Sequence, residues 1–496
     1  MTSPAFAQGS KRFIKGACLA LLVAAFTGST AIGQQRFVLN SQAQLPTIGD
    51  PADRIFSPTQ ELKLGEDFLR SVYRSGAVLQ EPEVSTYLQH LGGTLTASLG
   101  NNDYNYTFFV INDLAINAFA VPGGFIGVNA GLILAANNES ELAGVVSHEI
   151  AHVAQRHIAR RIADMSETQL PTLGAVLAGI LLASNSDSSD AGQAMIYAGV
   201  AGQAQSMVNF TRQNEIEADR VGLQILYNAG FDPNGMADFF RIMQRQRFGR
   251  IPEEYRFLLT HPLDNVRISE AQGRIDKLPE QKHTSSLNFR LAKARLQAVT
   301  SNDPRKLVLN IEKNIQARAK PDVVELYAYS QALERNGEYS KAREQLEALI
   351  DKDPENITYQ LAYARALHYD NKIKEAEKTL EKMFVIYPGN FSVNYYYALV
   401  LKEAGKAAEG RDLLKQYLRR NSAPTIDVYK LLAELHADSG SRINSQQALA
   451  EYHFGMGNYQ AAIFQLKHAL NDTDLDFVTR AQIEQRLREM LEKTES

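Results

Sequence analysis

The stretch VVSHEIAHVAQRH, residues 145–157, contains two histidines four residues apart and a glutamate directly after the first of them. On a helix, residues four apart lie on the same face, so His148 and His152 can present both imidazole rings to one metal ion. Zinc binds neutral imidazole nitrogen, and a catalytic zinc site keeps one coordination position open for water. The carboxylate of Glu149 could take the proton of that water and pass it to a leaving amine. The stretch therefore predicts a buried helix with a metal-dependent hydrolytic centre.

A third metal ligand is expected downstream, in TRQNEIEADRVGLQIL, residues 211–226. Glu215 and Asp219 lie one helical turn apart, so Glu215 could bind the ion while Asp219 supports a ligating histidine from behind. Glu217 lies about 200° around the same helix from Glu215 and should face elsewhere. The alternative interpretation is a solvated acidic helix face, which is the ordinary role of such residues.

The residues before the metal motif predict a small sheet. Residues 62–76 and 84–100 have helical patterns, and YTFFVIND, residues 106–113, has the aromatic and β-branched content of a strand. NAFAVPGGFIGVNAGLI, residues 117–133, predicts a strand, a turn and a second strand. Because proline confines strands to edges and bulges, one of these could be an edge strand that pairs with an extended peptide. An ordinary hairpin packed on the core is the alternative.

The N-terminus has the layout of a secretory signal peptide. Lys11, Arg12 and Lys15 precede the apolar run GACLALLVAAF and the small-residue segment STAIG, which predicts a cut after Gly33. The alternative is a membrane anchor, although the run is shorter than the roughly 20 residues that span a bilayer. Cys18 is the only cysteine and lies inside this run. An exported mature chain without disulfides fits a bacterial periplasm.

The C-terminal part repeats itself from about residue 320. NGEYSKA around Ala342 recurs as DNKIKEA around Ala376 and as AGKAAEG around Gly410, at offsets of 34 residues. A helical pattern with this period, and a small residue where two helices touch, is the tetratricopeptide signature. Such units must stack to bury their apolar faces. We expect three clear repeats and one or two degenerate ones, behind a leading helix pair over residues 291–314; an unrelated helical bundle is the alternative.

Between the two metal motifs, residues 170–208 contain two apolar runs separated by NSDSSDAG. The first run is only about 14 residues long and the second is interrupted by glycine and glutamine, so neither spans a bilayer comfortably. We expect a helical hairpin that covers the active-site cleft and restricts access to extended chains. A core helix pair without gating is the alternative.

Four motifs in this order carry a family resemblance. HEIAH followed by NEIEAD, preceded by NAFAVPGG and followed by LLTHPLDNVRISEA, resembles the gluzincin metallopeptidases related to HtpX and the CAAX prenyl protease. With a signal peptide and a tetratricopeptide array, the chain is similar to the BepA-like family of periplasmic β-barrel assembly-enhancing proteases. The resemblance implies that one zinc ion per chain is bound by His148, His152 and Glu215. It also implies that Glu149 is the general base and that Asp219 supports a ligand.

The same resemblance singles out His261 in LLTHP. In the family, a histidine at this motif can occupy the water position of the zinc and hold the enzyme inactive. Without the resemblance, a lone histidine before proline is more often a turn residue. Arg267 could stabilise a transition-state oxyanion or form a simple salt bridge. His157, five residues after His152, is expected to cap or pack rather than bind metal.

These patterns predict a mainly α protein: a zincin-like α+β metallopeptidase domain with a small β-sheet, followed by a tetratricopeptide α-solenoid. A chain of 496 residues is too long for one hydrophobic core. We place the signal peptide in residues 1–33, the zinc metallopeptidase domain in residues 34–280 and the repeat domain in residues 281–496.

Two functions are consistent with this organisation. The first is a periplasmic zinc-dependent endopeptidase and assembly factor that degrades misfolded or stalled outer-membrane β-barrel proteins and promotes their assembly. Its repeats would contact these unfolded or misassembled proteins or the outer-membrane β-barrel assembly machinery. The second is a chaperone-like scaffold that acts through the repeats, with a latched or silent metal site. A purely structural metal site would not need Glu149, which favours the first.

The charge balance bears on further partners. The chain has 52 basic and 56 acidic residues, so it offers no overall basic surface for a nucleic-acid backbone, and nucleic acid is not expected as a partner. A peripheral contact with the membrane stays open.

Overall fold

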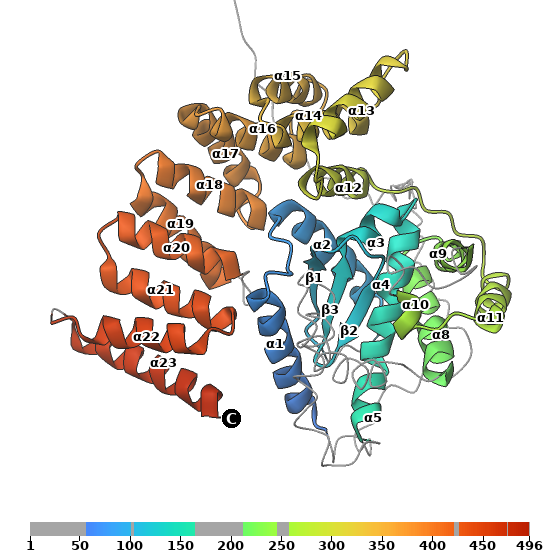
Figure 1. The fold of residues 1–496 in the computed structure, drawn as a ribbon, viewed down its shortest axis with the longest axis horizontal. Helices are drawn as coiled ribbons and strands as arrows, with labels where there is room; N and C mark the ends of the chain where they lie inside the picture. The colour runs from blue at the N-terminus through green and yellow to red at the C-terminus, as the bar shows by residue number, and fades with distance from the viewer. Residues whose placement is uncertain are drawn as a thin grey trace, which may run out of the picture. The chain divides into compact units, whose positions relative to one another are not determined.

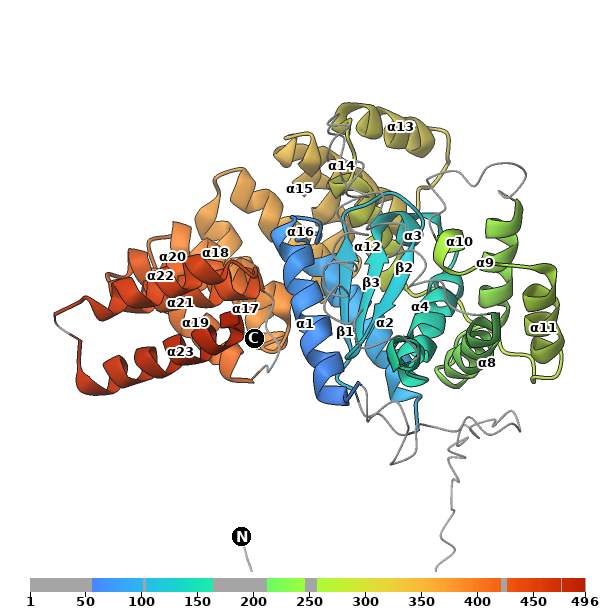
Figure 2. The same cartoon turned by 60° about the horizontal axis from the view of Figure 1, so that its bottom comes forward.

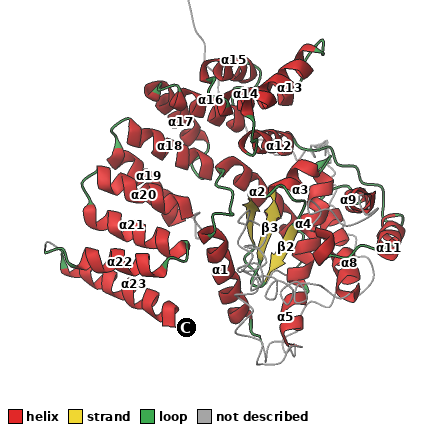
Figure 3. Ribbon diagram, viewed as in Figure 1, coloured by secondary structure: helices red, strands yellow, loops and turns green. Residues whose placement is uncertain are grey.

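The structure, a computed structural model, describes residues 56–100, 104–163, 212–245, 257–420, 426–473 and 475–495. The predicted signal peptide, residues 1–33, and the hairpin expected over residues 170–208 lie outside the described residues. Within the described ranges the chain is mainly helical with one small sheet (Figure 3), which confirms the predicted fold class. No described helix is both long enough and apolar enough to cross a lipid bilayer.

The first half of the described chain surrounds the sheet with helices (Figure 1). Its elements are α1 (Pro58–Arg74), α2 (Pro82–Ala97), β1 (Thr107–Ile111), β2 (Ala118–Val121), β3 (Phe125–Asn129), α3 (Ala130–Ala135), α4 (Glu139–Ala154), α5 (His157–Ala163), α8 (Arg212–Asn228), α9 (Asn234–Arg245), α10 (Phe257–Thr260) and α11 (Asn265–Ile275). The strand, turn and strand predicted over residues 117–133 are confirmed as β2 and β3, except that the chain turns helical at Ala130. An apolar run without alternation does not distinguish a strand from a helix, which is why the prediction extended the strand too far.

The strand order in the sheet is β1-β3-β2, with β1 parallel and β2 antiparallel to β3. Successive side chains of a strand point to opposite faces. Accordingly, Phe108 and Val110 join the main core with α2 and α4, whereas Phe109 and Ile111 pack with Phe68 of α1. Among the described strands β2 pairs only with β3, so it is an edge strand that lies against α4.

The second half consists of stacked helices in chain order (Figures 1 and 2). They are α12 (Leu287–Val299), α13 (Pro304–Gln316), α14 (Val323–Arg335), α15 (Tyr339–Ile350), α16 (Ile357–Tyr369), α17 (Ile373–Ile386), α18 (Phe391–Glu403), α19 (Ala407–Arg420), α20 (Ile426–Asp438), α21 (Arg442–Gly455), α22 (Tyr459–Leu470) and α23 (Phe477–Glu495). The helices α14, α16 and α18 begin 34 residues apart, as the sequence period predicted. The small residues of the repeat, Ala342, Ala376 and Gly410, are buried where adjacent helices touch.

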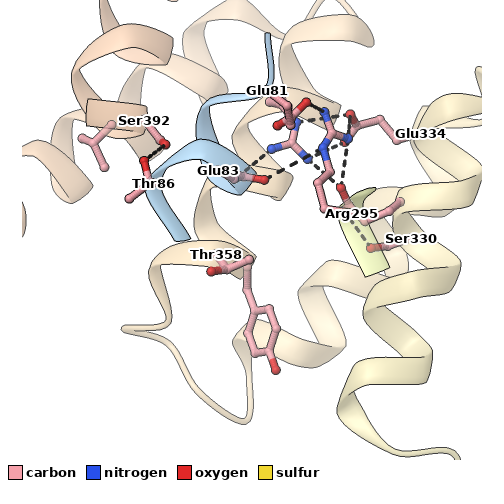
Figure 4. Close-up of polar contacts among 12 residues, drawn as sticks. Glu81, Glu83, Thr86, Arg295, Ser330, Glu334, Thr358 and Ser392 are labelled. Carbon is pink, nitrogen blue, oxygen red and sulfur yellow. Dashed lines mark hydrogen bonds and ion pairs between the residues drawn. The ribbon is translucent and has the colours of Figure 1, made fainter. Parts of the chain in front are cut away.

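A buried cluster of charges joins the two halves at the start of α2 (Figure 4). Arg295 of α12 lies 2.9 Å from both Glu81, directly before α2, and Glu334 of α14. Arg365 of α16 lies 2.6 Å from Glu83 of α2 and 3.2 Å from Glu334. Helix α12 also packs on α2 and α3 as well as on α14, so it belongs to both neighbourhoods. The domain boundary near residue 280 stays a prediction.

Candidate metal centre

Helix α4 contains both histidines, and every one of its residues is buried. Asn138 caps its first turn by accepting a hydrogen bond from the backbone N–H of Glu141. His148 and His152 lie on one face of the helix, as the spacing predicted, with their Nε2 atoms 3.0 Å apart. Both side chains are shielded from solvent.

Two further donors converge on this pair from other elements. Glu215 of α8 places Oε1 3.5 Å from Nε2 of His152 and Oε2 3.6 Å from Nε2 of His148. His261, directly after α10, places Nδ1 3.0 Å from Oε1 of Glu215 and 3.4 Å from Nε2 of His148. The four donor atoms all lie within 4.8 Å of one another.

These separations fit a tetrahedral ion. Metal–ligand bonds of about 2.0–2.1 Å at tetrahedral angles place neighbouring ligand atoms roughly 3.3–3.4 Å apart. The five contacts given above, 3.0–3.6 Å, lie around that value, and the four donor atoms as a set lie within 4.8 Å of one another. Three imidazole nitrogens and one carboxylate oxygen are the donor set of a first-row divalent metal such as zinc. The residues therefore suit a metal ion.

A buried salt-bridge system supports His148 and Glu215. Oδ1 of Asp219 lies 3.0 Å from Nδ1 of His148. Arg267 donates to both oxygens of Asp219, from Nε and Nη2, at 2.7 Å each, and its Nη1 lies 2.6 Å from Glu215. Asp219 thus contacts the second ring nitrogen of His148, and its role as the support of a metal ligand stays a prediction. The guanidinium of Arg267 is engaged with carboxylates, which corresponds to the salt-bridge alternative of the sequence analysis.

The charges of this system shift several pKa values. Burial alone would lower the pKa of His148, but Asp219 and Glu215 outweigh it and raise the pKa to about 9. Burial lowers the pKa of His152 well below its usual value, and the neighbouring His148 adds to the effect. Burial would raise the pKa of Glu215, yet His261, His148 and Arg267 hold it well below its usual range. Glu215 is therefore ionised in this arrangement, as a carboxylate that binds a metal ion must be.

Glu149, the predicted general base, is fully buried beside these donors. Its Oε1 lies 3.4 Å from Nε2 of His261. Burial raises the pKa of Glu149, although the neighbouring His261 and His148 act in the opposite direction. A carboxylate with a raised pKa beside these donors has the properties of a proton acceptor.

His152 has a further neighbour that the sequence analysis did not connect with the site. His157 places Nδ1 2.9 Å from Nδ1 of His152, and its Nε2 lies 3.2 Å from Glu217. On an uninterrupted helix His157 would point about 140° away from His152. The helix is interrupted, however, because Arg156 has φ +53°. No signal in the sequence marks this interruption, so spacing alone could not have found the contact.

Comparison with known proteins gives family matches in both parts of the chain. Residues 82–275 match peptidase family M48 and residues 323–366 match a tetratricopeptide repeat. The beta-barrel assembly-enhancing protease of Escherichia coli (strain K12) is 35% identical over 355 residues, which cover 70% of this chain and 70% of the relative. The protein of that name from Yersinia pestis is 33% identical and covers 67% of this chain and 68% of its own length.

A more distant relative matches a smaller share of the chain. The mitochondrial metalloendopeptidase OMA1 of Schizosaccharomyces pombe is 28% identical over 199 residues, 40% of this chain and 55% of the relative. The E. coli and Y. pestis relatives cover both halves of the chain, and the M48 match contains all four metal donors. The chain therefore belongs to the family of beta-barrel assembly-enhancing proteases and is a metallopeptidase of peptidase family M48.

Proposed function

We propose that the chain is a periplasmic zinc-dependent endopeptidase that degrades misfolded or stalled outer-membrane β-barrel proteins and promotes their assembly. The observation that carries the catalytic part is the position of Glu149 beside four converging metal donors. The names of the relatives in E. coli and Y. pestis support the role in β-barrel assembly. The periplasmic location rests on the signal-peptide pattern before Gln34.

In this proposal His148, His152 and Glu215 hold the zinc ion. Zinc bound there would polarise the scissile carbonyl and lower the pKa of water. Glu149 would take a proton at its carboxylate and donate it to the leaving amine. Edge strand β2 lies against α4, so an extended substrate could pair with the edge of β2 that no described strand occupies and reach Glu149 in a fixed orientation.

His261 would act as the latch of the resting enzyme. It contributes the fourth donor and at the same time places Nε2 3.4 Å from Glu149. Its ring stacks on Phe257 of α10 at a centroid distance of 4.5 Å, which holds it in this position. A substrate would have to displace His261 before water could take the fourth position and approach Glu149.

The test is cleavage of an unfolded outer-membrane β-barrel protein by residues 34–496, beside the Glu149→Gln variant at equal zinc content. We expect the unchanged chain alone to cleave, because glutamine cannot accept the proton. Equal cleavage by both chains would contradict the role of Glu149.

The scaffold hypothesis is separated from a latched enzyme by a third chain, His261→Ala. Cleavage by His261→Ala, but not by the double variant with Glu149→Gln, would support a latched peptidase. No cleavage by any chain, together with zinc bound at one ion per chain, would favour a scaffold that acts through its repeats.

A further inference from the structure

We propose that His157 and Glu217 are positioning residues that fix the tautomer and orientation of the metal ligand His152. The inference rests on the proposed metal site and adds a second supporting system to it. His148 is supported by Asp219 and Arg267, whereas His152 is supported by a histidine and, behind it, a carboxylate.

The contacts are consistent with one assignment of hydrogens to the ring nitrogens of His152 and His157. Nε2 of His152 faces Nε2 of His148 and Oε1 of Glu215, so this nitrogen must present its lone pair to a bound ion. The hydrogen of a neutral His152 then resides on Nδ1, which can donate to Nδ1 of His157 at 2.9 Å. His157 accepts there and keeps its own hydrogen on Nε2, which donates to Oε2 of Glu217 at 3.2 Å.

Other proton arrangements conflict with this geometry. If His157 carried hydrogens on both nitrogens, two N–H groups would face each other across 2.9 Å when His152 binds the metal. If Glu217 were replaced by a group that cannot accept, the preference of His157 for hydrogen on Nε2 would weaken. Ligating histidines are generally oriented by an acceptor on their second nitrogen, and loss of that acceptor typically costs 10–100-fold in metal affinity.

The chain makes a strained turn directly before His157. Arg156 adopts φ +53°, which is uncommon for a residue with a side chain. Its guanidinium is fixed by Oε1 of Glu61, at 2.6 Å and 2.9 Å, and donates to the carbonyl of Phe56 at 3.1 Å. The turn separates α4 from α5, and the ring of His157 at the start of α5 lies edge-on to His152 at a centroid distance of 4.9 Å.

Glu217 reaches His157 because it lies on the opposite side of α8 from Glu215. The two glutamates of NEIEAD therefore serve different histidines: Glu215 faces the donor cluster, and Glu217 faces His157. Arg160 is the nearby competitor for Glu217, with Nη1 3.6 Å from Oε2. It offers a matched control, since its removal breaks an ion pair of Glu217 without touching either histidine contact.

The experiment measures the zinc affinity of residues 34–496 by chelator competition, in the Glu149→Gln background so that no chain cleaves itself. We expect His157→Ala to bind zinc 10–100-fold more weakly, and Glu217→Leu, whose side chain cannot accept a hydrogen bond, to bind it several-fold more weakly. His157→Asn, whose side-chain oxygen can accept in place of Nδ1, should recover part of the loss. Arg160→Gln should bind zinc as the parent does.

Two readouts separate positioning from a merely structural role. The visible spectrum of the cobalt(II)-loaded protein should change in His157→Ala, because the ligand field depends on how His152 is oriented. The melting temperature of the metal-free chain should stay close to that of the parent.

Three results would overturn the inference: unchanged zinc affinity in His157→Ala, an unchanged cobalt spectrum, or a loss of affinity explained by a metal-free chain that no longer folds. Absence of zinc binding by the Glu149→Gln parent would instead refute the proposed metal site itself.

Discussion

At the scale of single residues, one buried arginine organises two carboxylates. Arg267 is almost inaccessible to solvent, and it binds Asp219 with two parallel contacts while reaching Glu215 with its third nitrogen. A planar guanidinium suits this geometry, which the ammonium group of lysine cannot reproduce. The same residue donates to the carbonyl of Pro262 at 2.8 Å, so it also anchors the chain beside His261.

We therefore expect Arg267→Met to destabilise the metal-free protein by about 3–5 kcal/mol, because it removes the arginine that compensates two buried carboxylates. Burial by itself would raise the pKa of Asp219, but Arg267 and His148 together outweigh it and lower that pKa. The stabilisation is then present above the ordinary pKa of an aspartate, about 4, and is lost as the pH falls through the lowered value.

Urea unfolding of the variant and of the parent at several pH values measures both effects. Arg267→Lys is the control that keeps the charge and loses the paired geometry, and it should fall between the two. A methionine variant as stable as the parent at pH 7 would contradict this assignment.

At the scale of helices, the metal site depends on how closely α8 approaches α4. Gly222 of α8 lies against the backbone of α4: a Cβ atom there would lie 3.0 Å from Cα and N of His148 and 3.1 Å from the carbonyl carbon of Ser147. Backbone atoms in the middle of a buried helix cannot easily move. The absence of a side chain at Gly222 thus brings Glu215 and Asp219 within reach of the histidines.

Gly222→Ala should therefore move α8 away from α4 by a few tenths of an ångström, lower stability by about 1–3 kcal/mol and weaken zinc binding. Gly93→Ala is a matched control, since Gly93 is also inside a helix, α2, but a Cβ there meets no atom within 4 Å. That control should gain roughly 0.5–1 kcal/mol from helix propensity. Denaturant unfolding and chelator competition test both variants, and equal behaviour of the two alanines would argue against the close-contact explanation.

At the scale of the whole molecule, buried charges join the first half of the described chain (α1–α11), called the catalytic half below, to the repeat helices that follow it. Arg365 contacts Glu83 of the catalytic half and Glu334 of the repeats, and Arg295 makes the equivalent bridge from Glu81 to Glu334. Burial raises the pKa of Glu83, even though both arginines act to lower it. These ions are stable only as a set, because each arginine compensates carboxylates from both halves.

Removal of one member should cost far more than removal of a surface ion pair. We expect Arg365→Met to lower the free energy of unfolding by about 3–5 kcal/mol, and a second change, Glu83→Gln, to recover part of it by deleting the uncompensated charge. Arg411→Met, which breaks the pair of Arg411 with the exposed Asp412, is the control and should have little effect. If Arg365→Met behaved like that control, the cluster would not be what joins the two halves.

The sequence by itself determined the local parts of this protein. His148 and His152 share a face because a four-residue spacing has that effect on any helix, and the repeat helices α14, α16 and α18 follow from a 34-residue period. The positions of the strands along the sequence could also be predicted, apart from the end of β3, where an apolar run could be either strand or helix.

Only the tertiary structure decided which distant residues meet the histidines. From the residues alone, Glu215 could equally have been a solvated acid, and the close packing of α8 at Gly222 brings it to the site. From the residues alone Arg267 could have formed a salt bridge anywhere, and only the tertiary structure shows that its carboxylate partners are Glu215 and Asp219. His157 contacts His152 because the chain turns at Arg156, and that turn is held by Glu61 from another helix. Spacing along one helix is fixed by backbone geometry, whereas contacts between helices depend on packing that no single segment encodes.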